Sequence, residues 1–232
     1  MDHGKRIIAI ETSGRHGSIA TLWGCDDGAE VIAQTVLSND ERTAQSLAPA
    51  LQKLLADTGW PPQSVELVAV TVGPGSFTGL RIGVTTAKAF AYAVKADVMG
   101  VNTLDALAIQ APQSCEPLWT ILDAQRQELF AARFTPDGNG SVKTDRETTI
   151  IAEGKWLAEL QAGDRVTGTA LNRLAHRLPD GVMLAPETTW QPMAEAVGRV
   201  AWSAYQSGHR DDLWKLAPYY YRASAAEEKL LS

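Results

Sequence analysis

Two short acidic segments of the sequence could take part in phosphate chemistry. Glu11 is followed by the polar run Thr12-Ser13-Gly14, and Asp123 is followed by Ala124-Gln125-Arg126. An acidic residue at the end of a strand, before a polar turn and a second strand, is the form of a phosphate-binding hairpin, where the acid holds magnesium indirectly. The alternative is a pair of solvated turn acids, and the residue types alone leave that choice open.

A glycine-rich turn lies between a predicted buried strand and a predicted helix, at Gly73-Pro74-Gly75-Ser76. A P-loop needs G-x-x-x-x-G-K-[ST], and the dinucleotide fingerprint needs G-x-G-x-x-G. Here Gly79 is followed by Leu80-Arg81, and Thr78 stands where the third glycine of the fingerprint would be. Neither phosphate motif fits, so we expect this turn to be glycine-rich mainly for packing.

We group the residues of these three turns as a candidate vestigial phosphate site. It consists of Glu11, Thr12, Ser13, Gly73, Gly75, Ser76, Asp123 and Arg126.

Small residues form one ridge along the helix predicted over 78–94. Gly79, Gly83, Ala87 and Ala91 follow one another at every fourth position, which puts them on one helix face. A glycine inside a helix costs up to about 1 kcal/mol relative to alanine, so the ridge suggests close helix packing. We predict that it contacts another subunit, and the alternative is that the chain's own helix over 46–58 covers it.

The predicted partner-contact residues come from both of these helices. They are Leu47, Leu51, Leu54, Gly79, Leu80, Gly83, Val84, Ala87 and Ala91.

No metal or nucleophile motif is present in the sequence. The four histidines and two cysteines are His3, His16, His176, His209, Cys25 and Cys115. They form no H-x-x-x-H, H-E-x-x-H or C-x-x-C pattern, and there is no G-x-S-x-G elbow. We therefore expect no catalytic residue and no metal ligand in this chain.

The composition limits the class of protein that positions these residues. The 232 residues are 45% hydrophobic and 21% charged, which is ordinary for a globular protein. The net charge of −6 makes independent binding of nucleic acid unfavourable, because affinity for phosphates comes mainly from Lys and Arg. We found neither a signal peptide nor an apolar run of membrane length, and we expect a soluble cytoplasmic protein.

Hydrophobic periodicity predicts the same order of elements in both halves of the chain. The first half has predicted strands over 6–11, 18–23, 30–36, 67–72 and 98–101, and helices over 46–58 and 78–94. The second half has predicted strands over 118–122, 128–134, 148–152, 165–167 and 182–185, and helices over 155–160, 171–178 and 193–207. We predict an α/β fold with two duplicated βββαβαβα domains, at 1–108 and 109–232. We expect the junction between the domains near 110–117. An alternative position for the last helix is against the first domain.

Five segments resemble the bacterial TsaB (YeaZ-type) family. They are IIAIETS at 7–13, GPGSFTGLRIG at 73–83, GVNTLDAL at 100–107, DAQRQELF at 123–130 and PYYYR at 218–222. The resemblance covers nearly the whole chain, and the segment at 73–83 is highly specific. It implies that the two domains are of the actin/hexokinase/heat-shock-ATPase-like type.

The resemblance implies a non-catalytic scaffold in N6-threonylcarbamoylation of adenosine 37 of tRNAs that read codons beginning with A. The implied partners are TsaD, a catalytic paralogue with a metal on an H-x-x-x-H pair, and TsaE, a small ATPase. ATP, magnesium and the metal would then be bound by these partners, tRNA would be contacted only through the complex, and the isolated chain would form a homodimer.

Two alternatives keep other functions open. The first is an ATP-dependent small-molecule kinase or ATPase of the same fold, for which Glu11 and Asp123 are the candidate carboxylates. The second, less favoured, is a glycoprotein-cleaving metalloprotease, for which the four scattered histidines supply no ligand set.

The chain departs from the family's pattern at three places. Glu11 stands where members commonly have Asp, and Arg42-Thr43 stands where many have His-Thr or His-Ser. The segment 168–172 (GTALN) lacks the paired glycines of the fold's adenosine loop. In addition, the segment 41–45 occupies the region where the paralogue carries its metal-binding histidines. These departures weaken the case for nucleotide or metal binding by this chain alone.

Overall fold

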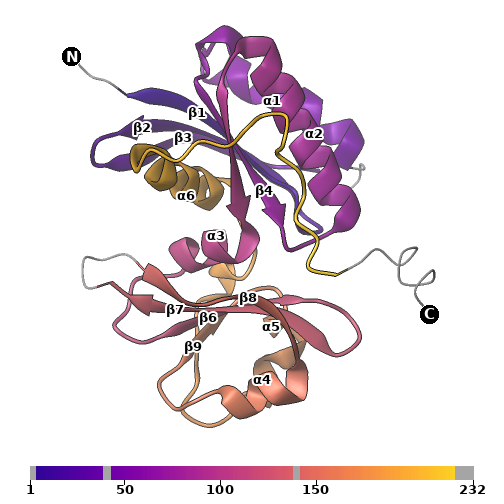
Figure 1. The fold of residues 1–232 in the computed structure, drawn as a ribbon, viewed down its shortest axis with the longest axis vertical. Coiled ribbons are helices and arrows are strands. Elements are labelled where there is room, and N and C mark those ends of the chain that lie inside the picture. The colour runs from indigo at the N-terminus through magenta and orange to yellow at the C-terminus, as the bar shows by residue number, and fades with distance from the viewer. Residues whose placement is uncertain (1–3, 39–42, 138–141, 223–232) are drawn as a thin grey trace.

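The structure is a computed structural model that describes residues 4–38, 43–137 and 142–222 (Figure 1). His3, and Glu41 and Arg42 of the segment 41–45, lie outside the described residues.

Two five-stranded mixed sheets form the framework of the molecule. The first has the order β3-β2-β1-β4-β5, with β1 Lys5–Glu11, β2 Ser18–Cys25, β3 Gly28–Val36, β4 Leu67–Gly73 and β5 Asp97–Asn102. The second has the order β10-β9-β6-β7-β8, with β6 Leu118–Asp123, β7 Glu128–Pro136, β8 Val142–Ala152, β9 Arg165–Thr167 and β10 Met183–Leu184.

The two sheets repeat one topology. In each of them the first three strands form an antiparallel meander, and the last two strands continue the sheet in parallel from the first strand. The same order and the same strand directions in both halves confirm the predicted α/β fold class with duplicated domains. The central strand β1 is fully buried from Ile7 to Ile10, because helices cover both of its faces.

Helices cover the two faces of the first sheet. Helices α1 (Thr43–Asp57) and α2 (Phe77–Val94) lie side by side on one face, and α6 (Ala194–Gln206) lies on the other (Figure 1). The remaining helices are α3 (Thr103–Gln110), α4 (Glu153–Glu159) and α5 (Leu171–Leu174), and short 3-10 turns lie at Pro62–Ser64, Ala175–Arg177 and Glu187–Thr189.

Helices α3 and α6 each pack on the sheet of the other half of the chain. Helix α3 follows β5 of the first sheet, yet Leu104 and Leu107 pack against Leu118 and Phe134 of the second sheet. Helix α6 comes from the second half and packs on β1 and β2 of the first sheet. The predicted boundary between residues 108 and 109 falls within α3, which lies between the two sheets (Figure 1).

Two of the differences between the observed and the predicted helices have a clear reason in the sequence. Helix α1 begins at Thr43 rather than at 46. The apolar period starts only at Leu47, so the first turn carries no hydrophobic signal. Helix α3 was not predicted, because this eight-residue helix is buried almost all round and shows no polar face with a helical period.

The small-residue ridge of α2 faces the chain's own sheet. A Cβ atom on Gly79 would lie 2.1 Å from the Thr12 carbonyl oxygen, and one on Gly83 would lie 2.1 Å from Thr12 Oγ1. Ala87 and Ala91 have no exposed surface. The ridge therefore lets α2 lie close to the end of β1.

The nine predicted partner-contact residues are all buried in this core. They are Leu47, Leu51, Leu54, Gly79, Leu80, Gly83, Val84, Ala87 and Ala91. A buried side chain cannot meet a second chain, so their assignment as a partner-contact surface is wrong. Small residues in a sequence show that a close contact exists, but not which side of the helix makes it.

Candidate functional site

A cleft of about 730 Å³ lies between the two halves of the molecule. The turns after β1 and β6, the start of α2 and the segment 219–222 all contribute to its walls. The lining residues include Ser13, Gly14, Gly75, Ser76, Phe77, Asp123, Gln125, Arg126, Phe130, Tyr219, Tyr220, Tyr221 and Arg222.

Glu11 lies at the end of β1 as a fully buried carboxyl. The Ser13 amide donates to Glu11 Oε1 over 2.6 Å, and the Ser13 hydroxyl donates to the same oxygen. Among the described residues, Glu11 Oε2 has no hydrogen-bond partner. Burial raises the pKa of this carboxyl to about 7, although the two hydrogen bonds from Ser13 act to lower it. Glu11 therefore binds a proton near neutral pH.

The glycine-rich turn before α2 packs directly on the first hairpin. The Ser76 amide donates to the Ser13 carbonyl oxygen over 2.6 Å, and a Cβ on Gly75 would lie 2.5 Å from that same oxygen. Ser76 also caps α2, since its hydroxyl accepts from the Gly79 amide over 3.2 Å. The close approach of two backbone turns explains the glycine at position 75.

The second hairpin has an unusual backbone. Gln125, Arg126 and Gln127 have φ values of 61°, 52° and 58°, so three successive residues with side chains adopt the left-handed conformation. Such a conformation costs roughly 1 kcal/mol or more per residue. Local hydrogen bonds support the turn, among them the Gln125 amide on Asp123 Oδ1 at 2.8 Å and the Glu128 amide on the Gln125 carbonyl oxygen at 2.9 Å.

The predicted phosphate-site residues separate into two groups in the structure. Ser13, Gly75, Ser76, Asp123 and Arg126 line the cleft from both halves. The remaining three, which are Glu11, Thr12 and Gly73, are buried and do not line it. The structure thus brings the two hairpins to one cleft, and their role in binding phosphate stays a prediction.

Sequence reasoning missed the aromatic residues of the cleft. Phe77, Phe130 and the run from Tyr219 to Tyr221 supply much of its apolar wall. The signal was present in the three consecutive tyrosines, but nothing local in the sequence shows that this late segment lies against α2.

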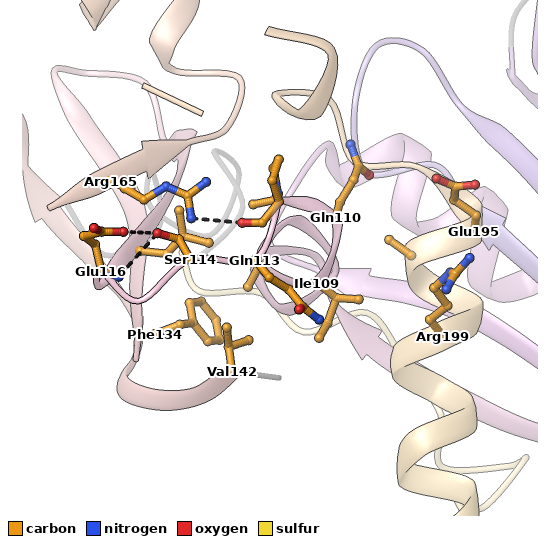
Figure 2. A pocket seen from close by; sticks show the side chains of 15 residues that line it. Ile109, Gln110, Gln113, Ser114, Glu116, Phe134, Val142, Arg165, Glu195 and Arg199 are labelled. Atoms are coloured by element: carbon orange, nitrogen blue, oxygen red, sulfur yellow. Dashed lines mark hydrogen bonds between the residues drawn. The ribbon is translucent and has the colours of Figure 1, made fainter. Parts of the chain in front are cut away.

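A second cavity of about 350 Å³ lies where α3, β6, β7 and α6 come together. Figure 2 shows Arg165 and Arg199 on opposite sides of it, with Glu116 and Glu195 nearby. One guanidinium nitrogen of Arg165 donates to the Pro112 carbonyl oxygen over 2.9 Å. Because two carboxylates and two guanidinium groups lie around this cavity, its charges favour neither an anionic nor a cationic ligand.

The outer face of α1 and α2 carries mostly small and uncharged side chains. Thr85, Ala89 and Ala93 recur at every fourth position of α2 and are exposed, as are Ala44 and Ala48 on α1. A second helix could approach this face closely. It lies opposite to the buried ridge that the sequence singled out.

Within 4–38, 43–137 and 142–222, no three His, Cys, Asp or Glu side chains are arranged to hold a metal ion. None of the helices in these ranges is both long enough and apolar enough to cross a membrane.

The family model that matches this chain and two of its curated relatives have names that refer to threonylcarbamoyl modification of adenosine in tRNA. The family model described as "TsaD: tRNA N6-adenosine threonylcarbamoyltransferase" matches residues 30–178. The tRNA threonylcarbamoyladenosine biosynthesis protein TsaB of Escherichia coli K12 is 30% identical over 236 residues, covering 97% of this chain and 98% of that protein. TsaB of Bacillus subtilis 168 is 31% identical over 159 residues, covering 68% of this chain and 67% of that protein.

Solved structures agree with the fold. A Pseudomonas aeruginosa protein described as similar to the peptidase YEAZ has a TM-score of 0.80 at 24% identity, covering 94% of this chain and all of that chain. YeaZ from the same organism has a TM-score of 0.78 at 23% identity, covering 93% and 99%. With the near full-length match to the E. coli protein, these findings establish that the chain belongs to the TsaB (YeaZ-type) family.

Proposed function

We propose that this chain is a non-catalytic partner of a TsaD-type subunit in the synthesis of threonylcarbamoyladenosine in tRNA. The observation that carries the proposal is the match to TsaB of E. coli, a tRNA threonylcarbamoyladenosine biosynthesis protein, over 97% of this chain. We assign the modification to N6 of adenosine 37, and catalysis, the metal and ATP with magnesium to the partners TsaD and TsaE. We place the complex in the cytoplasm, where tRNA is modified.

Reconstitution tests the proposal. Matching TsaD and TsaE subunits, threonylcarbamoyl-adenylate synthase and unmodified tRNA are combined with and without this chain, and the modified nucleoside is quantified. We expect modification to require the chain. Equal modification in its absence would remove the proposed role.

We infer that the TsaD-type partner docks on the outer face of α1 and α2. The exposed ridge of Thr85, Ala89 and Ala93 permits close helix packing, and α1 adds the exposed residues Ala44 and Ala48. In the isolated chain a second copy could take the same place, which would give a two-fold dimer. This surface replaces the buried ridge as the proposed contact.

Replacing Ala89 by arginine should weaken partner binding at least tenfold and leave thermal unfolding unchanged. A long charged side chain at this exposed position would hold the two helical faces apart, and a tenfold loss corresponds to about 1.4 kcal/mol. The matched control is Ala158→Arg, because Ala158 is an exposed alanine on α4 in the second half. Binding is measured by titration of immobilised TsaD-type subunit. If both variants weakened partner binding equally, or if neither variant weakened it, the result would count against the proposed face.

Calorimetric titration of the isolated chain with Mg-ATP should give no saturable heat. Glu11 is buried and bonded to Ser13, so the first hairpin presents no carboxylate to a magnesium ion in the cleft. Asp123 in the second hairpin already accepts from Arg173 over 3.2 Å and from the Gln125 amide over 2.8 Å. Micromolar binding would favour the kinase or ATPase alternative, which the family membership does not favour.

A further inference from the structure

A segment near the end of the described chain crosses from the first half of the molecule to the second. Residues 216–222, which we call the strap, follow α2 from the level of Lys88 towards its N-terminus and end beside the hairpin of β6 and β7 (Figure 1). Along this path the strap makes direct contacts with both halves.

The strap is fixed to the first half through backbone groups. Lys88 Nζ donates to the Leu216 carbonyl oxygen over 2.8 Å, and the Tyr219 amide donates to the Val72 carbonyl oxygen over 2.7 Å. Position 73 must be glycine for this approach: its φ is 133°, and a Cβ there would lie 2.6 Å from the Tyr219 carbonyl oxygen. The end of β4 is thus shaped to receive the strap.

Tyr220 adds a side-chain contact to the start of α2. Its ring stacks on Phe77 with centroids 4.7 Å apart, and its hydroxyl accepts from Arg81 Nε over 3.0 Å. The Arg81 guanidinium in turn lies 4.0 Å from the centroid of the Phe77 ring.

The last two residues of the strap contact the end of β5 and the second half. The Tyr221 hydroxyl accepts from Asn102 Nδ2 over 3.0 Å, and the same Nδ2 donates to Thr148 Oγ1 on β8 over 2.9 Å. The Tyr221 ring also lies 5.9 Å from the ring of Phe130. Arg222 donates to the Ala124 carbonyl oxygen over 2.7 Å and forms an ion pair with Glu128.

We infer that the strap locks the angle between the two halves by closing the cleft side of the molecule. Helices α3 and α6 lie between the two sheets, so a motion that opens or closes the cleft would turn about this region (Figure 1). The strap bonds Val72 and Arg81 on one side of the cleft and Ala124 and Glu128 on the other, so such motion must break its contacts. The chain is then a rigid frame rather than a hinged, closing enzyme.

This lock is independent of the proposed function, because it concerns the chain alone. Its test is the distance distribution between two spin labels, one in each half, in a background with Cys25 and Cys115 replaced by serine. Gln52→Cys on α1 and Ala158→Cys on α4 are suitable sites, since both residues are exposed helix positions. The distribution is measured by pulsed electron resonance.

The comparison is between two truncations. Removal of 223–232 leaves the whole strap and should keep one narrow distance distribution, as in the full chain. Removal of 219–232 retains the buried Leu216 but deletes the contacts to the end of β4, to α2 and to the β6–β7 hairpin, and should broaden the distribution severalfold in width. An equally narrow distribution after removal of 219–232 would overturn the inference.

A conservative variant covers the case in which the shorter chain does not fold. Tyr221→Phe combined with Arg222→Met removes the bonds to Asn102, Ala124 and Glu128 but keeps the size of both side chains. We expect this variant to broaden the distribution while circular dichroism stays unchanged. A distribution as narrow as that of the full chain would contradict the lock.

Discussion

Gly79→Ala should lower the free energy of unfolding by about 1–2 kcal/mol, towards the upper end of the net cost. The added Cβ would lie 2.1 Å from the carbonyl oxygen of Thr12, which is backbone and cannot rotate away. Overpacking of this kind typically costs 1–3 kcal/mol or more, and the better helix propensity of alanine returns only about 1 kcal/mol. Urea denaturation of the isolated chain measures the difference.

Alanine variants of two further glycines, Gly83 and Gly154, serve as comparisons for the loss of stability expected in Gly79→Ala. Gly83→Ala should cost less, because its Cβ would meet the Thr12 side-chain oxygen at 2.1 Å, and a side chain can turn. Gly154→Ala on α4 is the matched control, since a Cβ there meets nothing within 4 Å. The free energy of unfolding of this variant should equal that of the parent chain or rise slightly. If Gly79→Ala instead unfolded like the parent and lost partner binding, the ridge would be an interface after all.

The strands and the duplicated order could be predicted because their signals are local. The run from Ile7 to Ile10 is apolar at every position, which is typical of a strand covered on both faces, and the turns on either side are polar or rich in glycine. The repeated order of elements then gave the fold class without any knowledge of three-dimensional contacts.

What could not be predicted depends on contacts between distant parts of the chain. The sequence shows that α2 carries a ridge of small residues, but the partner of that ridge is Thr12, which lies 67 positions before Gly79. In the same way, only the fold brings Tyr220 onto Phe77 and α3 onto the second sheet. Periodicity identifies a buried face, and it does not identify what buries it.

The two candidate phosphate hairpins were predicted correctly in their position on the strands but not in the direction of both side chains. The sequence places Glu11 at the end of β1 and Asp123 at the end of β6. In the structure Asp123 lines the cleft, whereas Glu11 is buried and does not line it. The direction of the Glu11 side chain could not be read from the sequence, because it is fixed by the hydrogen bonds from Ser13. As a result, a residue predicted to face a ligand is instead part of the core.

Glu11→Gln should remove a loss of stability that the parent chain shows between about pH 4.5 and pH 7. The pKa of Glu11 is about 7 in the folded chain, where burial disfavours the carboxylate, against an ordinary value of 4.5. Below pH 4.5 the carboxyl is protonated in both the folded and unfolded states, and its contribution to stability is fully present. As pH rises through the window, the unfolded chain releases the proton first, so unfolding becomes more favourable.

The size of this loss follows from the same two pKa values. Their difference of about 2.5 corresponds to about 3 kcal/mol, reached once the pH has risen through 7. Asp105, whose pKa burial and the charge of Glu147 raise to about 6, adds a loss of the same sign in both proteins. The informative quantity is therefore the difference between parent and variant, measured by urea denaturation at several pH values. Glutamine remains neutral throughout and can still accept from Ser13, so the difference should change with pH by about 3 kcal/mol in favour of the variant. Parallel curves would mean that Glu11 is ionised in the folded chain and that its carboxylate finds a compensating partner there.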